Sequence, residues 1–132
     1  MQKINNPFNI RYSKFNAWQG QIRSYHGFVV FESLDYGLRA GIILLNNYIK
    51  NGYNSVSAII SRFAPVTEND TKAYIDFVEK ALLANNYEIN NIEPFSLTFY
   101  KLCCIICYYE SHMYICPSRL VNIVSKFSLK KN

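Results

Sequence analysis

The feature of the sequence that most constrains its fold is a nearly continuous apolar segment, residues 95–109, in which Lys101 is the only charged side chain. A helix that is apolar on every side must be covered on every side. The segment is shorter than the roughly 20 residues that cross a bilayer, and Pro94 suits the first turn of a helix. We therefore predict a central helix over residues 94–109, buried by the rest of the chain.

Four other segments carry apolar residues on one helical face only, which predicts amphipathic helices packed around the central one. In chain order, the positions expected to face inward are Leu34, Leu38, Ile42, Leu45 and Ile49; Val56, Ile59, Ile60 and Phe63; Tyr74, Phe77, Val78, Ala81 and Leu82; and Leu120, Val121, Val124 and Phe127.

The ends of these helices also have local signals. Side-chain oxygens that cap a helix start, and Gly or Pro after a helix end, mark the boundaries. The four amphipathic helices are expected to start, in chain order, at Ser33, near Ser55, at either Thr67 or Asn69, and at Pro117. The first is expected to stop at Gly52 and the second at Ala64. Asp76 and Lys80 are expected to form an i,i+4 pair on a solvent-exposed face.

The N-terminal part differs from the helical remainder. Residues 1–20 are rich in Asn and lack periodicity, whereas residues 21–31 have β-forming side chains on both sides of a turn-like Ser24–Gly27 segment, which indicates a short hairpin or extended stretch. With 132 residues and no linker-like region, the chain is expected to be a single, mainly α domain over residues 1–132.

Charge and aromatic content limit the classes of partner. Residues 1–62 contain seven Lys or Arg and two acidic residues, whereas residues 63–132 contain seven of each sign. The cations of the first half are scattered, so the pattern does not favour nucleic acid, although a basic surface attracts anionic partners. Aromatic residues make up 16% of the chain and suit both a core and a contact surface.

Chemistry-bearing residues are few. All four Cys lie between residues 103 and 116, without two C-x-x-C pairs at zinc spacing, and buried free thiols are the usual role of such residues. We expect no metal site and no cofactor. A glycosidase mechanism requires carboxyl groups. The candidates are Glu32, next to a helix start, and Glu110, at the end of the most buried helix. For each of them an ordinary position at a helix start or helix end is the favoured interpretation.

The N-terminal half carries a series of motifs in a fixed order. They are Asn5-Asn6-Pro7-Phe8-Asn9-Ile10-Arg11, Trp18-Gln19-Gly20, Gly27-Phe28-x-x-Phe31, Gly37-Leu38-Arg39-Ala40, Ala64-Pro65 and Glu68-Asn69-Asp70-Thr71-x-x-Tyr74. This order resembles a family of small phage proteins described as virion structural proteins. The resemblance covers about residues 5–78, and the same order is similar to part of the glucosaminidase-type, lysozyme-like domains.

The resemblance implies a lysozyme-like helical domain of a phage virion, made in the host cytoplasm, that contacts other virion proteins. In the larger lysozyme-like group the essential Glu lies on a helix before the Asn-Asn loop. Here that loop starts at Asn5, which implies a catalytically incomplete domain. The alternative is a virion-associated peptidoglycan hydrolase with peptidoglycan as its partner and Glu32 as its acid.

The matching motifs also offer a set of binding residues. Asn6, Arg11, Trp18 and Arg39 are expected to converge on one surface or cleft. The structural alternatives are that Asn6 satisfies backbone groups of its own loop and that Arg39 pairs with Asp35 one helical turn away.

Overall fold

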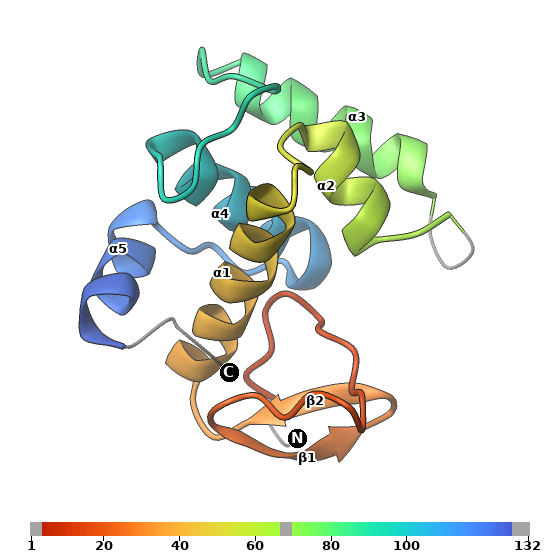
Figure 1. The fold of residues 1–132 in the computed structure, drawn as a ribbon, viewed down its shortest axis with the longest axis vertical. Coiled ribbons are helices and arrows are strands. Elements are labelled where there is room, and N and C mark those ends of the chain that lie inside the picture. Colours follow the sequence, from red (N-terminus) through yellow and green to blue (C-terminus); the bar gives the residue numbers. More distant parts are fainter. Residues whose placement is uncertain (1–3, 67–69, 128–132) are drawn as a thin grey trace.

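The computed structural model describes residues 4–66 and 70–127 (Figure 1). Within them, a hairpin of two strands precedes five helices. Their bounds are β1, Gln21–Tyr25; β2, Phe28–Phe31; α1, Leu34–Lys50; α2, Val56–Phe63; α3, Thr71–Leu83; α4, Leu97–Ser111; and α5, Pro117–Lys126. This confirms the mainly helical fold with a short N-terminal hairpin. No described helix is both long enough and apolar enough to cross a membrane.

The hairpin forms one end of the molecule, and the helices form the rest (Figure 1). Its strands are antiparallel, with Tyr25 opposite Phe28 and an irregularity between Gln21 and Arg23. The turn is only His26-Gly27, and both residues have positive φ, 50° and 85°. Two successive positive φ values match the right-handed twist of the strands that they join. The turn is therefore tighter than the expected Ser24–Gly27 segment, because β1 continues to Tyr25.

The N-terminal loop lies along the free edge of β2. The Val29 N–H donates to the Ile10 carbonyl at 3.1 Å, and the Tyr12 N–H donates to the Gly27 carbonyl at 2.8 Å. Buried backbone groups of an irregular loop need hydrogen-bond partners. The hairpin supplies them here, and these bonds hold the loop beside β2.

The central helix predicted from the apolar segment is present as α4. Residues 102–107 are all buried, which is possible only when every side of the helix is covered. Its covering elements include α1, α3 and α5. The helix starts three residues later than predicted, because the Ser96 hydroxyl accepts from the Phe99 N–H and caps it. Pro94 lies before that cap, outside the helix.

The inward faces of α1 and α2 agree largely with the prediction, whereas two residues of the later helices do not. Phe77 of α3 is 38% exposed and Val121 of α5 is 45% exposed. The buried residues of α3 are Thr71, Tyr74, Val78 and Leu82. Phe77 lies beside this buried face rather than within it. In α5 the buried residues are Leu120, which the sequence pattern selected, and Ile123, which it did not.

The predicted starts of α1 and α2 and the predicted end of α2 are confirmed, whereas the start of α3 differs from the prediction. Ser33 and Ser55 accept hydrogen bonds from Tyr36 N and Ala58 N, and α2 is capped by Ala64 immediately before Pro65. The third helix is capped by Asp70, which accepts from the Ala73 N–H at 3.1 Å. The two predicted caps, Thr67 and Asn69, lie outside the described residues.

Two glycines of α1 let the N-terminal loop approach the helix closely. A Cβ at Gly37 would lie 1.9 Å from the Asn5 carbonyl oxygen, and one at Gly41 would lie 2.1 Å from the Phe8 ring. Gly37 and Gly41 are four residues apart, so they share one face of the helix. This face is where the loop that carries the first motif is fastened to the helical body.

We expect Gly37→Ala to lower the free energy of unfolding by about 1–3 kcal/mol, because the added methyl group meets a backbone atom. The higher helix propensity of Ala, worth about 1 kcal/mol, does not offset this. Urea unfolding followed by circular dichroism measures the change. Ser57→Ala, on the exposed side of α2, is the control and should leave stability nearly unchanged. A Gly37→Ala protein at least as stable as the wild type would contradict the close approach.

Candidate functional site

A pocket with a volume of about 350 Å³ lies where the N-terminal loop meets the helices. Its walls come from that loop, the start of β2, α1, the end of α2 and the end of α4. The lining residues are Phe8, Asn9, Ile10, Arg11, Asn16, Trp18, Phe28, Leu44, Tyr48, Phe63, Ala64 and Glu110. Among these described residues, Arg11 and Glu110 are the charged ones. The pocket therefore combines aromatic walls with one cation and one carboxylate.

Glu110 is the best-anchored polar group of this pocket. Its Oε1 accepts from the Asn9 Nδ2 at 3.0 Å, and its Oε2 accepts from the Tyr74 hydroxyl at 2.8 Å. Burial, together with the neighbouring Glu110 carboxylate, raises the pKa of Tyr74 far above its usual range. Tyr74 therefore keeps its proton and donates a hydrogen bond to the carboxylate. Two donors from separate segments fix the orientation of the Glu110 side chain.

The same contact region joins the N-terminal loop to the end of α4. Asn9 also donates to the Glu110 backbone carbonyl at 2.9 Å, and the Ser111 hydroxyl donates to the Pro7 carbonyl at 2.9 Å. Asn9 has a φ of 53°, a left-handed conformation that Asn adopts more readily than most residues. The end of α4 is therefore held against the Asn-rich loop, although about 100 residues separate them in sequence.

Two of the four predicted binding residues, Arg11 and Trp18, line this pocket together. The Arg11 guanidinium lies 4.8 Å from the centre of the Phe28 ring, a cation–π arrangement that orients its charge. Trp18 is buried, with 6% of its surface exposed, so its ring forms a fixed wall of the pocket. An aromatic wall beside an oriented cation is suited to binding a polar ligand with a flat apolar face.

Asn6 is buried and forms hydrogen bonds inside its own region. Its Nδ2 donates to the Ile10 and Val29 carbonyls at 3.0 and 2.9 Å, and its Oδ1 accepts from the Ile10 N–H at 2.9 Å. Asn6 does not line the pocket. Its geometry matches the structural alternative, in which the side chain satisfies loop backbone.

Arg39 is almost fully buried in α1, with 1% of its surface exposed, and it does not line the pocket either. Burial lowers its pKa, but a guanidinium stays charged in proteins. Asp35, which the sequence offers as its i+4 partner, contacts Arg119 at 3.0 Å and Lys126 at 3.8 Å. The structure thus connects the start of α1 with α5 through Asp35.

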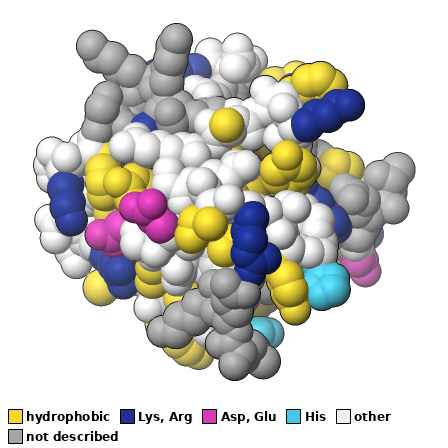
Figure 2. Space-filling view, turned by 90° about the horizontal axis from the view of Figure 1, so that it is seen from below, with side chains coloured by type: hydrophobic (Ala, Val, Ile, Leu, Met, Phe, Trp, Pro, Cys, Tyr) yellow, Lys and Arg dark blue, Asp and Glu magenta, His cyan; other side chains and the backbone are white. Residues whose placement is uncertain are grey.

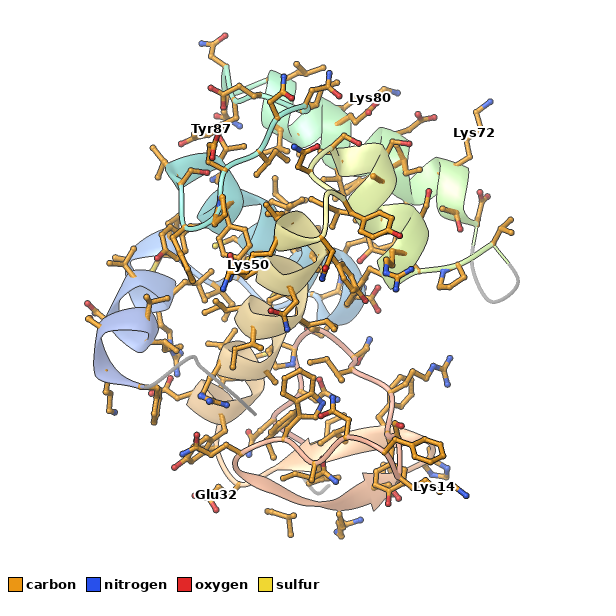
Figure 3. All side chains as sticks on the ribbon, viewed as in Figure 1. Lys14, Glu32, Lys50, Lys72, Lys80 and Tyr87 are labelled. Carbon is orange, nitrogen blue, oxygen red and sulfur yellow. The ribbon has the colours of Figure 1, made fainter. Side chains whose placement is uncertain are left out.

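The two candidate carboxylates have different positions. Glu32 is exposed just after β2, at the opposite end of the hairpin from Lys14 (Figure 3), and it does not line the pocket. Glu110 does line it. Sequence spacing could not separate the two, because the approach of the α4 end to the N-terminal loop is a tertiary contact. The only sequence signal for Glu110 was its position at the end of the most buried helix.

The cysteines are free thiols. Cys103, Cys104 and Cys107 are buried and Cys116 is exposed. Burial raises the pKa of Cys103 and Cys107 well above the usual range and that of Cys104 to about 11, which keeps these thiols protonated and unreactive at neutral pH. Among the residues that the structure describes, no three His, Cys, Asp or Glu side chains are grouped as metal ligands would be.

Comparison with known proteins links the chain to a phage. It is 37% identical over 93 residues to Protein P5 of Pseudoalteromonas phage PM2. The chain is a distant homologue of a phage protein. The matched segment covers 66% of this chain and 58% of Protein P5, so the chain spans less than two thirds of the relative's length. No protein-family model matches the sequence.

Proposed function

We propose that this protein is a structural or adaptor component of a phage virion, and that its lysozyme-like helical domain contacts other virion proteins. The observation that carries this proposal is the homology to Protein P5 of phage PM2. A domain of this kind needs a stable body and exposed contact groups, and both features are present in the described residues.

The exposed surface supports a role in protein contacts. Large apolar side chains remain exposed at separate places, including Phe15 with 88% and Tyr114 with 86% of their surfaces exposed. The face at the hairpin end has hydrophobic side chains interspersed with Lys and Arg (Figure 2). Aromatic residues and Arg are enriched in protein–protein interfaces, so this composition fits a contact surface.

The pocket argues against hydrolysis by the common two-carboxylate mechanisms. These mechanisms place two carboxyl groups on opposite sides of the scissile bond. The described pocket lining contains one carboxylate, Glu110, and both of its oxygens accept hydrogen bonds from the protein. Glu32, the acid named by the sequence for a hydrolase, lies outside the pocket.

The position of Glu110 favours a second candidate function, a virion-associated peptidoglycan hydrolase that acts during entry. In this version Glu110 replaces Glu32 as the acid. It is fixed in a pocket with Trp18 and Arg11, and a substrate-assisted route needs one protein carboxyl group rather than two. The site would then bind a sugar chain of peptidoglycan across its aromatic wall.

The two candidates predict different results with the purified protein. We expect no release of muropeptides from isolated cell walls, and no change with Glu32→Gln, because Glu32 is exposed and does not line the pocket. Release of muropeptides that disappears in Glu110→Gln but persists in Glu32→Gln would replace the adaptor proposal with the hydrolase. Circular dichroism of both variants checks that they are folded.

Presence in the particle is tested separately. Mass spectrometry of purified virions that encode this protein should detect it at a defined copy number relative to the major capsid protein. Detection only in the lysate of infected cells, and never in purified particles, would contradict a structural role.

A further inference from the structure

A second, more apolar pocket lies on the opposite side of α4 from Glu110 and its neighbours in the first pocket. Its volume is about 500 Å³, and it is formed by α3, α4 and the segment 113–117 that leads into α5. Its wall includes Phe77, Ile105, Tyr108, Met113 and Ile115. Volumes of 300–1,000 Å³ with mostly apolar walls are typical of small-molecule sites. No residue lines both pockets.

The charge of this second pocket has one sign. Among the described residues that line it, Lys101 is the only charged one and none is a carboxylate. The Lys101 ammonium also acts on the thiol of Cys104, a neighbouring wall residue, whose pKa it lowers against the larger effect of burial. Lys101 lines the same pocket as Cys104 and Ile105, so an anionic group of a ligand beside it would meet little competing negative charge.

The outer wall is built from aromatic rings. Tyr114 is mostly exposed, yet its ring centre lies 5.0 Å from that of Tyr108. Tyr108 stacks in turn on Phe77 at 6.3 Å. This chain of rings continues the pocket wall outward and explains how an exposed tyrosine can keep a defined position. Phe77, which sequence periodicity assigned to the core, is exposed because it contributes to this wall.

We propose that this second pocket binds an amphiphilic anion, with the apolar body against Ile105 and the aromatic wall and the anionic head at Lys101. A cationic ligand is disfavoured by Lys101. A sugar is disfavoured because the walls offer few hydrogen-bonding side chains. A neutral apolar ligand would leave the ammonium without a counter-charge. A fatty-acid carboxylate and the head of an anionic phospholipid share the required chemistry. This proposal goes beyond the virion role and does not depend on it.

The test uses the full chain and two soluble probes, laurate and 8-anilinonaphthalene-1-sulfonate. We expect the sulfonate to bind with enhanced fluorescence and laurate to displace it. Lys101→Met should weaken both about tenfold or more, as expected for the loss of a charged hydrogen-bond partner. Lys72→Met changes an exposed lysine near the start of α3 that does not line this pocket (Figure 3); it is the matched control and should bind as the wild type does.

Two further measurements locate the ligand. Ala81→Phe should fill part of the second pocket and weaken both probes. Cys116 lines the pocket and is the exposed thiol among the four, so saturating laurate should slow its alkylation by a maleimide severalfold. Vesicles of anionic phospholipid, compared with micelle-free laurate, distinguish a membrane lipid from a free fatty acid as the source of the ligand.

Binding of laurate that weakens in both Lys101→Met and Ala81→Phe, with protection of Cys116, supports the proposal. Absence of binding at millimolar probe, or binding that neither variant changes, would overturn it. Adsorption to anionic vesicles that neither Lys101→Met nor Ala81→Phe changes would also overturn it, because the protein would then attach to the lipid surface outside this pocket.

Discussion

Asn6→Ala is expected to lower the free energy of unfolding by about 3 kcal/mol or more. The substitution removes three hydrogen bonds at once, to the Ile10 N–H and to the Ile10 and Val29 carbonyls. Asn6 is only 4% exposed, so water cannot readily replace the lost partners. An unsatisfied buried polar group costs about 1–3 kcal/mol. Urea unfolding at neutral pH measures the difference.

Asn85→Ala is the control for this measurement. Asn85 also donates from its side chain to a backbone carbonyl, that of Ala81, but it is exposed. Its replacement should change stability by about 0.5 kcal/mol or less. If Asn6→Ala were equally mild, Asn6 would not be the group that fastens the loop to the hairpin.

Leu102→Ala is expected to lower the free energy of unfolding by about 2–5 kcal/mol, the range for a leucine truncated in a close-packed core. Leu102 has no exposed surface, and it lies in the part of α4 that is covered on every side. The truncation removes buried apolar contacts and leaves a cavity that rigid neighbouring helices fill only in part.

Leu97→Ala is the matched control, because it makes the same change in the same helix at a position that is 60% exposed. It should alter stability by less than about 1 kcal/mol. Similar losses for the two variants would contradict the central position of α4. Thermal unfolding followed by circular dichroism, with urea titration as a second probe, compares them.

The sequence determined the features that depend on local chemistry. Continuous apolarity over α4 required burial on every side, and the Ser33 and Ser55 hydroxyls fixed two helix starts through hydrogen bonds within one turn. One-sided apolar patterns predicted the remaining helices, because a helix that exposes an apolar stripe gains free energy by covering it. Phe77 and Val121 were predicted to be buried but are exposed. Helical spacing alone allows either of two adjacent faces to be the buried one, and the neighbouring element decides which face is covered.

The tertiary structure alone decided the candidate site. Glu110 and Asn9 are about 100 residues apart, and no periodicity or local motif indicates that the end of α4 lies against the N-terminal loop. The tertiary structure also gives the motif residues different roles. Arg11 and Trp18 line the pocket, whereas Asn6 forms hydrogen bonds with backbone groups of the loop and the hairpin. Sequence spacing records which side chains share an element. Which elements meet is decided by the packing of the whole core, and for that reason Glu110 rather than Glu32 became the carboxylate of the pocket.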